Sequence, residues 1–133
     1  MKTKLNFLIV VALIFISGNK SIAQEIQWTA PEYSNSFKNP FLGDQKATND
    51  GMEIFSQMCV LCHGLKGEGN GQAGLTLERK PANFLALHVS NQTDGAIFWK
   101  ITNGKAPMAS YFELLTDTQR WKLVNYIREL EKK

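Results

Sequence analysis

Cysteine and histidine are scarce in this 133-residue chain, which contains two of each. Both cysteines lie in one pentapeptide, CVLCH, at residues 59–63. A structural zinc site needs four Cys or His ligands, and the adjacent Cys62 and His63 do not easily reach one tetrahedral ion together. The usual paired ligands are also missing from the second half, which offers only His88. A disulfide across two intervening residues closes too small a loop to stabilise a fold much. Zinc and a disulfide framework are therefore both poor explanations of these residues.

The N-terminal segment carries an unbroken apolar run from Phe7 to Ile16, preceded by Lys2 and Lys4 and followed by small residues up to Ala23. This is the pattern of a secretory signal, so we expect residues 1–23 to be cleaved after about Ala23. The run is shorter than the roughly 20 residues that span a bilayer. A retained N-terminal anchor is the alternative. Because no cysteine directly follows the run, we expect no lipoprotein anchor.

An excess of basic charge is also missing once the signal is set aside. The full chain has a formal net charge of +3, and residues 1–23 contain three lysines and no acidic residue. The expected mature chain is therefore formally neutral. Nucleic-acid binding loses its electrostatic basis, and we expect no nucleic-acid partner.

The CVLCH pentapeptide is the C-x-x-C-H pattern of covalent haem attachment. A two-residue gap on a tight helical turn points the thiols of Cys59 and Cys62 at one porphyrin edge, where each can add to a vinyl group. His63 then supplies the proximal imidazole to the iron. Haem c is attached outside the cytoplasm, so the export signal agrees with this motif. A thioredoxin-like dithiol is the rival interpretation, but it expects strand-rich βαβ flanks, and these flanks look helical and loop-like.

Three parts follow along the chain: the signal at 1–23, an extended arm at 24–48 and a haem domain at 49–133. The arm is punctuated by Asn39-Pro40 and similar breaks. Its aromatic residues predict that it packs over the domain, and a partly disordered leader is the alternative. No internal repeat and no β-rich stretch is present, which favours an all-α fold.

Three helices are predicted in the domain. Asn49-Asp50 would cap a helix that delivers the cysteines, and Gly51 in its first turn suggests a close helix crossing. Thr93-Asp94 would cap a short helix that runs to about Thr102. A capping box at 116–119 begins the last helix. Its apolar stripe is formed by Leu123, Tyr126, Ile127 and Leu130, and the side chains expected mostly in solvent are Arg120, Lys122, Arg128 and Glu129.

A glycine-rich run at residues 64–71 follows the pentapeptide. It lacks the Gly-Lys-Ser/Thr ending and the preceding strand of a phosphate-binding loop. We expect its glycines to let the backbone pass close to the porphyrin edge.

Met108 is the predicted distal ligand of the iron. It lies in a non-periodic stretch between two helices, where a loop can present its sulfur, and an axial thioether raises the reduction potential. Met52 and Met58 precede the cysteines on the haem-delivering helix, on the wrong side of the ring. His88 is the rival ligand, and an open sixth position is the third possibility.

These motifs together resemble the class I cytochrome c family. The resemblance rests on Gly51-x-x-x-Phe55-x-x-x-Cys59-x-x-Cys62-His63-Gly64, on the Gly67-x-Gly69-x-Gly71 loop, on the helix after Asp94, on Met108 and on the segment from Arg120 to Leu130. It implies three to four short helices with long loops around one covalent haem, and crossing first and last helices, with Gly51 and Phe55 against Tyr126. It also implies that a carbonyl between Leu75 and Pro81, with Pro81 our choice, accepts a hydrogen bond from His63. Trp99 would donate to a propionate or simply pack in the core.

The resemblance implies an exported, non-enzymatic, mono-haem electron carrier of a respiratory chain, located in the periplasm. Its expected partners are redox proteins such as a quinol-oxidising complex and a terminal oxidase or reductase. The alternatives are a haem subunit attached to a larger membrane complex, and an enzyme or gas sensor with an open sixth site. Basic side chains could steer an acidic partner, although scattered solvated charges also explain them: Lys66, Arg79, Lys80 and Lys105.

Overall fold

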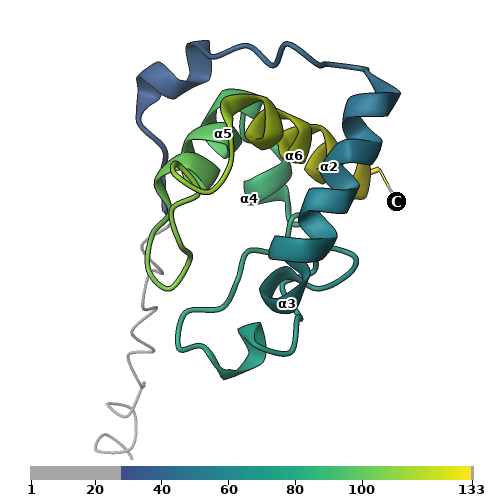
Figure 1. Cartoon of the computed structure of the whole chain (residues 1–133). Helices are drawn as coiled ribbons and strands as arrows, with labels where there is room; N and C mark the ends of the chain where they lie inside the picture. The colour runs from purple at the N-terminus through teal and green to yellow at the C-terminus, as the bar shows by residue number, and fades with distance from the viewer. Residues whose placement is uncertain (1–27, 133) are drawn as a thin grey trace, which may run out of the picture.

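The computed structural model describes residues 28–132 and is all-α over this range (Figure 1). The predicted signal at 1–23 lies outside the described residues. Three main helices are joined by long loops and by shorter helical turns. In chain order the elements are η1 (Glu32–Ser36), α2 (Gln45–Met58), α3 (Val60–His63), η2 (Gly74–Thr76), α4 (Leu87–Ser90), α5 (Asp94–Asn103) and α6 (Asp117–Leu130). The predicted all-α class is confirmed.

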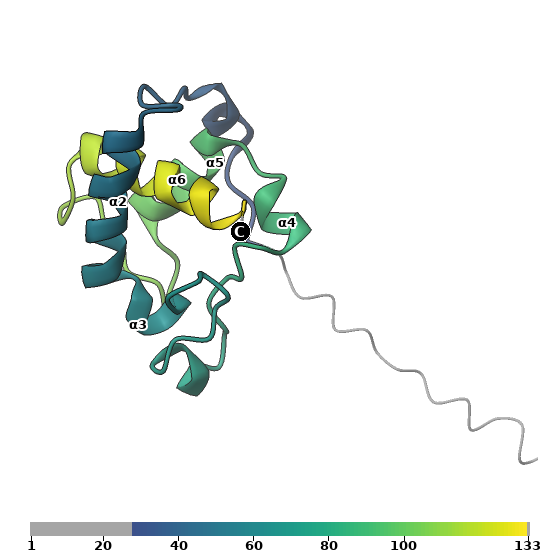
Figure 2. The ribbon, with the colours of Figure 1, turned by 90° about the vertical axis from the view of Figure 1, so that its right-hand side faces the viewer.

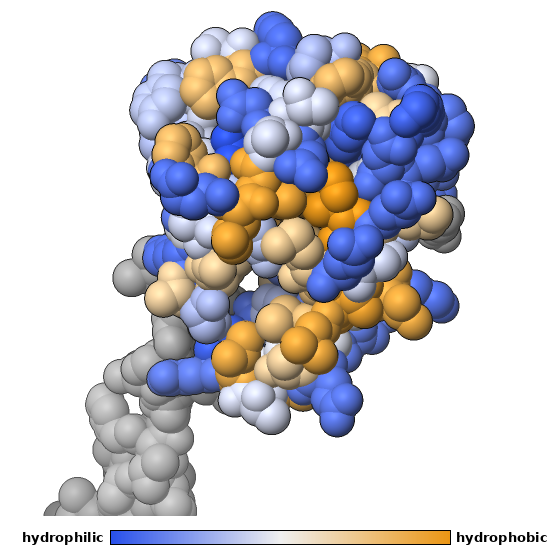
Figure 3. All heavy atoms as spheres, in the orientation of Figure 1, coloured by the Kyte–Doolittle hydropathy of each residue, from blue (hydrophilic) through white to orange (hydrophobic). Residues whose placement is uncertain are grey.

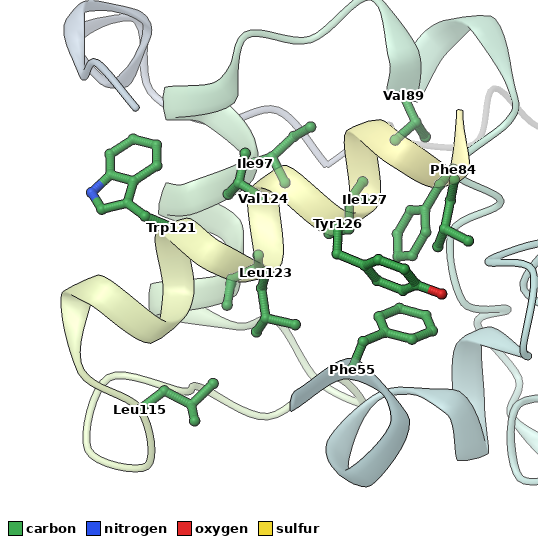
Figure 4. Close-up of a cluster of buried hydrophobic side chains, with 12 residues drawn as sticks. Phe55, Phe84, Val89, Ile97, Leu115, Trp121, Leu123, Val124, Tyr126 and Ile127 are labelled. Atoms are coloured by element: carbon green, nitrogen blue, oxygen red, sulfur yellow. The ribbon is translucent and has the colours of Figure 1, made fainter. Parts of the chain in front are cut away.

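Helices α2 and α6 cross in close contact, as both ribbon views show (Figures 1 and 2). Gly51 lies at the crossing, where an added Cβ would stand 2.0 Å from the carbonyl oxygen of Lys122. One turn further along α2, Phe55 is 1% exposed. Its ring centroid lies 5.2 Å from that of Tyr126 (Figure 4). The predicted crossing of the first and last helices is therefore confirmed. Phe55 meets Tyr126 as expected, whereas Gly51 meets the backbone of Lys122 and Leu123.

The start of α2 differs from the prediction. The helix begins at Gln45, and the carboxylate of Asp44 accepts a 3.0 Å hydrogen bond from the backbone N–H of Ala47. The predicted cap at Asn49-Asp50 is wrong, because Asp44 offers the same capping chemistry five residues before Asn49 and no helix breaker follows it. The extra turn is useful to the fold, since Ala47 is 2% exposed and belongs to the core.

The other two predicted helix starts are confirmed. The Thr93 side chain accepts from the Ala96 N–H at 3.1 Å. Thr116 and Gln119 form the reciprocal hydrogen bonds of a capping box. Both helices therefore begin at caps whose hydrogen-bond partners lie three residues apart in the sequence.

The arm packs along α5 and reaches α6 through side-chain amides. The amide of Asn39 donates to Asp94 at 3.0 Å and to Asn125 at 2.6 Å. Asn125 in turn donates to the carbonyl of Phe41 at 2.5 Å. These bonds tie residues that are more than fifty positions apart, which agrees with the packed arm and not with a disordered leader for residues 28–44.

The solvent face expected on α6 is only partly correct. Arg120 is 2% exposed, and the side chain of Arg128 is 20% exposed and pairs with Asp94 at 2.8 Å. The side chain of Lys122 is also only 23% exposed and pairs with Asp50 at 2.7 Å. Predicting these three side chains mostly in solvent was wrong. Each guanidinium reaches backbone carbonyls of another segment, and a pattern of charged residues does not reveal such tertiary partners.

Candidate functional site

The two cysteines and His63 lie on one turn at the end of α2. The backbone changes direction at Cys59, whose N–H still donates to the Phe55 carbonyl at 2.9 Å. The N–H of His63 donates to the Cys59 carbonyl at 2.9 Å and closes the turn. Cys59 and Cys62 are partly buried free thiols. The turn therefore presents two thiols and an imidazole within five residues.

The loop that follows folds back on this turn through backbone hydrogen bonds. Gly69 N–H donates to the His63 carbonyl at 2.8 Å, and Gly71 N–H donates to the Cys62 carbonyl at 3.1 Å. A Cβ at Gly71 would lie 2.4 Å from the carbonyl oxygen of Leu61. We predicted that these glycines serve the porphyrin edge. The contact that the structure shows is with the backbone of the CVLCH turn itself.

The imidazole of His63 is held in one orientation. Its Nδ1 lies 3.1 Å from the carbonyl oxygen of Ala82, so Nδ1–H donates and Nε2 keeps its lone pair. The predicted acceptor Pro81 is wrong by one residue, because the loop presents the next carbonyl to the ring. The ring stacks on Phe84 with centroids 4.6 Å apart. Burial lowers the pKa of His63, which the Ala82 hydrogen bond partly opposes. A neutral imidazole with a free Nε2 is the form that binds a metal.

The environment of Cys59 is apolar. Burial, and secondly the charge of Cys62, raises the pKa of the Cys59 thiol to about 12. The thiol is therefore uncharged near neutral pH and is a weak nucleophile in the folded chain. This is unlike the activated thiolate of a dithiol oxidoreductase.

Met108 lies on the loop between α5 and α6, and this loop returns to the cysteine turn. Met108 and Lys105 exchange two backbone hydrogen bonds of 2.9 and 3.0 Å, and the Met108 side chain packs against the core. Three residues later, the hydroxyl of Tyr111 donates to the Met58 carbonyl at 3.1 Å. Burial, followed by the charges of both cysteines, raises the pKa of Tyr111. The loop that carries Met108 is thus anchored beside the turn that carries the thiols.

An open cavity of about 590 Å³ is lined by residues 77–79 from one side and by Ala106 and Pro107, the residue before Met108, from the other. Figure 3 shows an opening between the helical body and the lobe below it, with apolar side chains on both sides. Two thiols and an oriented imidazole on one turn, with a thioether on the loop that Tyr111 ties to that turn, form a donor set that fits haem c. Cys59 and Cys62 could attach it, and His63 and Met108 could bind its iron.

The rival ligands are less well placed. Met52 and Met58 are 44% and 37% exposed on α2, before the cysteines. His88 is exposed on the short helix α4. Among residues 28–132, no cluster of three or more His, Cys, Asp or Glu side chains could hold a metal ion. The indole N–H of Trp99 donates to the Tyr33 hydroxyl at 3.0 Å, which makes it part of the arm contact and not the propionate donor that we considered.

This combination of crossing helices and a C-x-x-C-H turn defines a cytochrome c domain. A family model described as "Cytochrome C oxidase, cbb3-type, subunit III" matches residues 46–127, and the chain belongs to this family. The cytochrome c domain implies haem-based electron transfer, and its two cysteines have the spacing of a haem c motif.

Among solved structures, the chain is similar to a chain of the Kuenenia stuttgartiensis reducing HAO-like protein complex, with 25% sequence identity and a TM-score of 0.58. The match covers 65% of this chain and 44% of that chain. This chain therefore corresponds to less than half of its structural relative. A search of the curated proteins found no match.

Proposed function

We propose that this protein is an exported mono-haem c-type cytochrome that carries single electrons between respiratory partners in the periplasm. The observation that carries the proposal is the arrangement of its two candidate axial ligands. His63 has its Nδ1–H held by Ala82, and Met108 lies on a loop anchored to the same cysteine turn through Tyr111. When bound, haem c supplies an iron that cycles between Fe(II) and Fe(III).

The chain's own residues provide attachment and rigidity. The thiols of Cys59 and Cys62 would form the two thioether bonds, and His63 and Met108 would bind the iron. Because the Ala82 carbonyl holds the His63 ring by its Nδ1–H, the imidazole would keep its orientation in both oxidation states of the iron. A coordination shell that stays unchanged keeps the reorganisation energy of electron transfer small. Electron transfer of this kind requires no catalytic residue.

The partners and location follow from the family and the N-terminal sequence. The matching family is described by its role in an oxidase, which supports redox partners in respiratory complexes, such as a quinol-oxidising complex or a terminal oxidase or reductase. Residues 1–23 have the sequence of a cleaved export signal. Within residues 28–132, no helix is long and apolar enough to cross a membrane.

Attachment to a larger membrane complex is the second candidate function. It is favoured by the family description, which names a subunit, and by the arm, where Tyr33 is 60% and Leu42 is 79% exposed. Fractionation of cells separates the two candidates. A free carrier is released with the periplasmic contents, whereas a subunit stays with the membranes after signal cleavage and leaves only with detergent.

Carbon monoxide binding tests the proposed axial ligation. The reduced wild-type protein should not bind CO at neutral pH, because Met108 fills the sixth position. Met108→Ala should bind CO and lose the Met-to-iron charge-transfer band of the oxidised protein. Met58→Ala is the matched control, since it removes a methionine that lies close to the cysteines but on α2, and it should behave like the wild type.

Two results would contradict the proposal. CO binding by the wild-type protein would indicate an open sixth site and favour a gas sensor or haem enzyme. Retention of the charge-transfer band in Met108→Ala would assign the sixth position to another residue.

A further inference from the structure

A buried arginine on α6 holds the segment that follows Met108. Arg120 is 2% exposed. Its Nη1 donates to the carbonyls of Tyr111 at 3.1 Å, Phe112 at 3.0 Å and Leu115 at 2.6 Å, and its Nη2 pairs with Asp117. An arginine is almost never so buried unless its charge is partnered. One side chain of α6 therefore fixes the backbone of residues 111–115.

The surroundings of Arg120 fix its orientation. The guanidinium lies over two aromatic rings, 5.4 Å from the centroid of Phe98 and 5.6 Å from that of Phe112. Its Nε is buried without a hydrogen-bond partner within the described part of the chain. A buried polar atom without a partner costs stability. The side chain is thus aimed so that Nη1 reaches the three carbonyls and Nη2 reaches Asp117, although this orientation leaves Nε unpaired.

Tyr111 connects the same segment to two other helices. Its N–H donates to the Ile101 carbonyl at 3.2 Å near the end of α5. Its hydroxyl donates to the Met58 carbonyl at 3.1 Å, one residue before Cys59. The ends of α2 and α5 and the start of α6 therefore meet at a single residue. This residue lies three positions after Met108.

We propose that Arg120 and Tyr111 act as positioning residues that hold the Met108 loop against the haem iron, an inference that rests on the proposed distal role of Met108. We call this pair the Arg120–Tyr111 strut. A thioether is a weak ligand, so its bond to iron depends on a loop that does not swing away. Hydrogen bonds that are lost when the loop opens raise the free energy of opening. The strut supplies such bonds.

An exogenous ligand measures this opening directly. Imidazole binds the oxidised iron only when Met108 leaves it, so the apparent imidazole affinity reports the opening equilibrium. In Arg120→Gln the carbonyls of residues 111, 112 and 115 lose their buried donor. Imidazole should then bind about tenfold more tightly than to the wild type, the change expected when roughly one net hydrogen bond no longer opposes opening. The Met-to-iron charge-transfer band should weaken in parallel.

Arg128→Gln is the matched control. Arg128 is also a largely buried arginine of α6, and it donates to the Ser90 carbonyl at 3.1 Å and pairs with Asp94. Its partners lie around α4 and the start of α5 and, through Glu131, at the end of α6, and none of them belongs to the Met108 loop. Its loss should lower the urea midpoint of unfolding and leave imidazole affinity within about twofold of the wild type. A merely structural role for Arg120 would make the two variants behave alike.

Tyr111→Phe provides a milder test if Arg120→Gln does not fold. It removes only the hydroxyl that reaches Met58, and it should still strengthen imidazole binding by about threefold. Unchanged imidazole affinity in this variant, or equal changes in Arg120→Gln and Arg128→Gln, would overturn the strut. The proposed function fails separately, because it requires the wild type to show the charge-transfer band and to bind imidazole more weakly than Met108→Ala.

Discussion

Replacing Gly51 by alanine tests the contact on which the fold depends. The added methyl carbon would stand 2.0 Å from the carbonyl oxygen of Lys122 and 2.6 Å from its carbonyl carbon. Contacts of this kind are essentially never shorter than 3.0 Å, so α2 and α6 must separate by about 1 Å at this point. Both opposing atoms belong to the backbone and cannot rotate away. The whole helix pair therefore has to move.

The expected size of the effect follows from two opposed contributions. Overpacking costs about 3 kcal/mol, at the upper end of the usual range, because the separation also loosens the packing of Phe55 and Leu123. Alanine gains about 1 kcal/mol over glycine through its helix propensity. We therefore expect Gly51→Ala to lower the free energy of unfolding by about 2 kcal/mol, a large share of the stability of a small domain.

Urea titration of the holoprotein, followed by far-ultraviolet circular dichroism, measures this change. Glu53→Ala is the matched control, because it places alanine on an exposed position of the same helix, where the effect should stay within about 0.5 kcal/mol. A Gly51→Ala protein as stable as the wild type would refute the close backbone contact between the two helices.

Three further predictions follow from the described contacts. The hydrogen bond from Lys122 lowers the pKa of Asp50 below 3.8. The stabilisation of the fold by ionised Asp50 is therefore present above pH 3.8 and is lost as the pH falls through the lowered pKa. In urea titrations, the stability of Asp50→Asn should match that of the wild type only at a pH below this pKa. Trp99→Phe removes the hydrogen bond to Tyr33 and should lower the free energy of unfolding by about 1 kcal/mol. The reduction potential measured by voltammetry should stay unchanged, and a clear shift of the potential would indicate that Trp99 contacts a haem propionate. If basic residues steer an acidic partner, stopped-flow electron transfer should slow with added salt and in Arg79→Glu, and salt-independent rates would exclude steering.

Local chemistry explains which parts of the fold were predictable. The caps at Thr93 and Thr116 are hydrogen bonds between residues three apart, so a short sequence window contains both partners. Gly51 was informative for a different reason, since a glycine early in a helix has a propensity cost that a close helix contact can offset. Asp44 was missed because Asn49-Asp50 carries the same capping signal and lies nearer to the apolar stripe.

The parts that could not be predicted depend on contacts between distant segments. The carbonyl that faces His63 belongs to Ala82 and not to Pro81, and only the path of the loop decides between two adjacent residues. Burial of Arg120 has no local signature, because its carbonyl partners are backbone atoms that every residue possesses. The indole of Trp99 meets Tyr33, 66 positions earlier, which no periodic pattern encodes.

In the proposed function, Cys59, Cys62, His63 and Met108 together hold one haem c that cycles by single electrons. An optical redox titration of the purified full-length protein, with an acid extraction of the haem beside it, addresses all four residues. We expect the haem to remain on the chain after acid extraction. We also expect one reversible one-electron transition, and a Met-to-iron charge-transfer band in the oxidised state only. A haem that can be extracted, or a high-spin spectrum without that band, would contradict the proposed function.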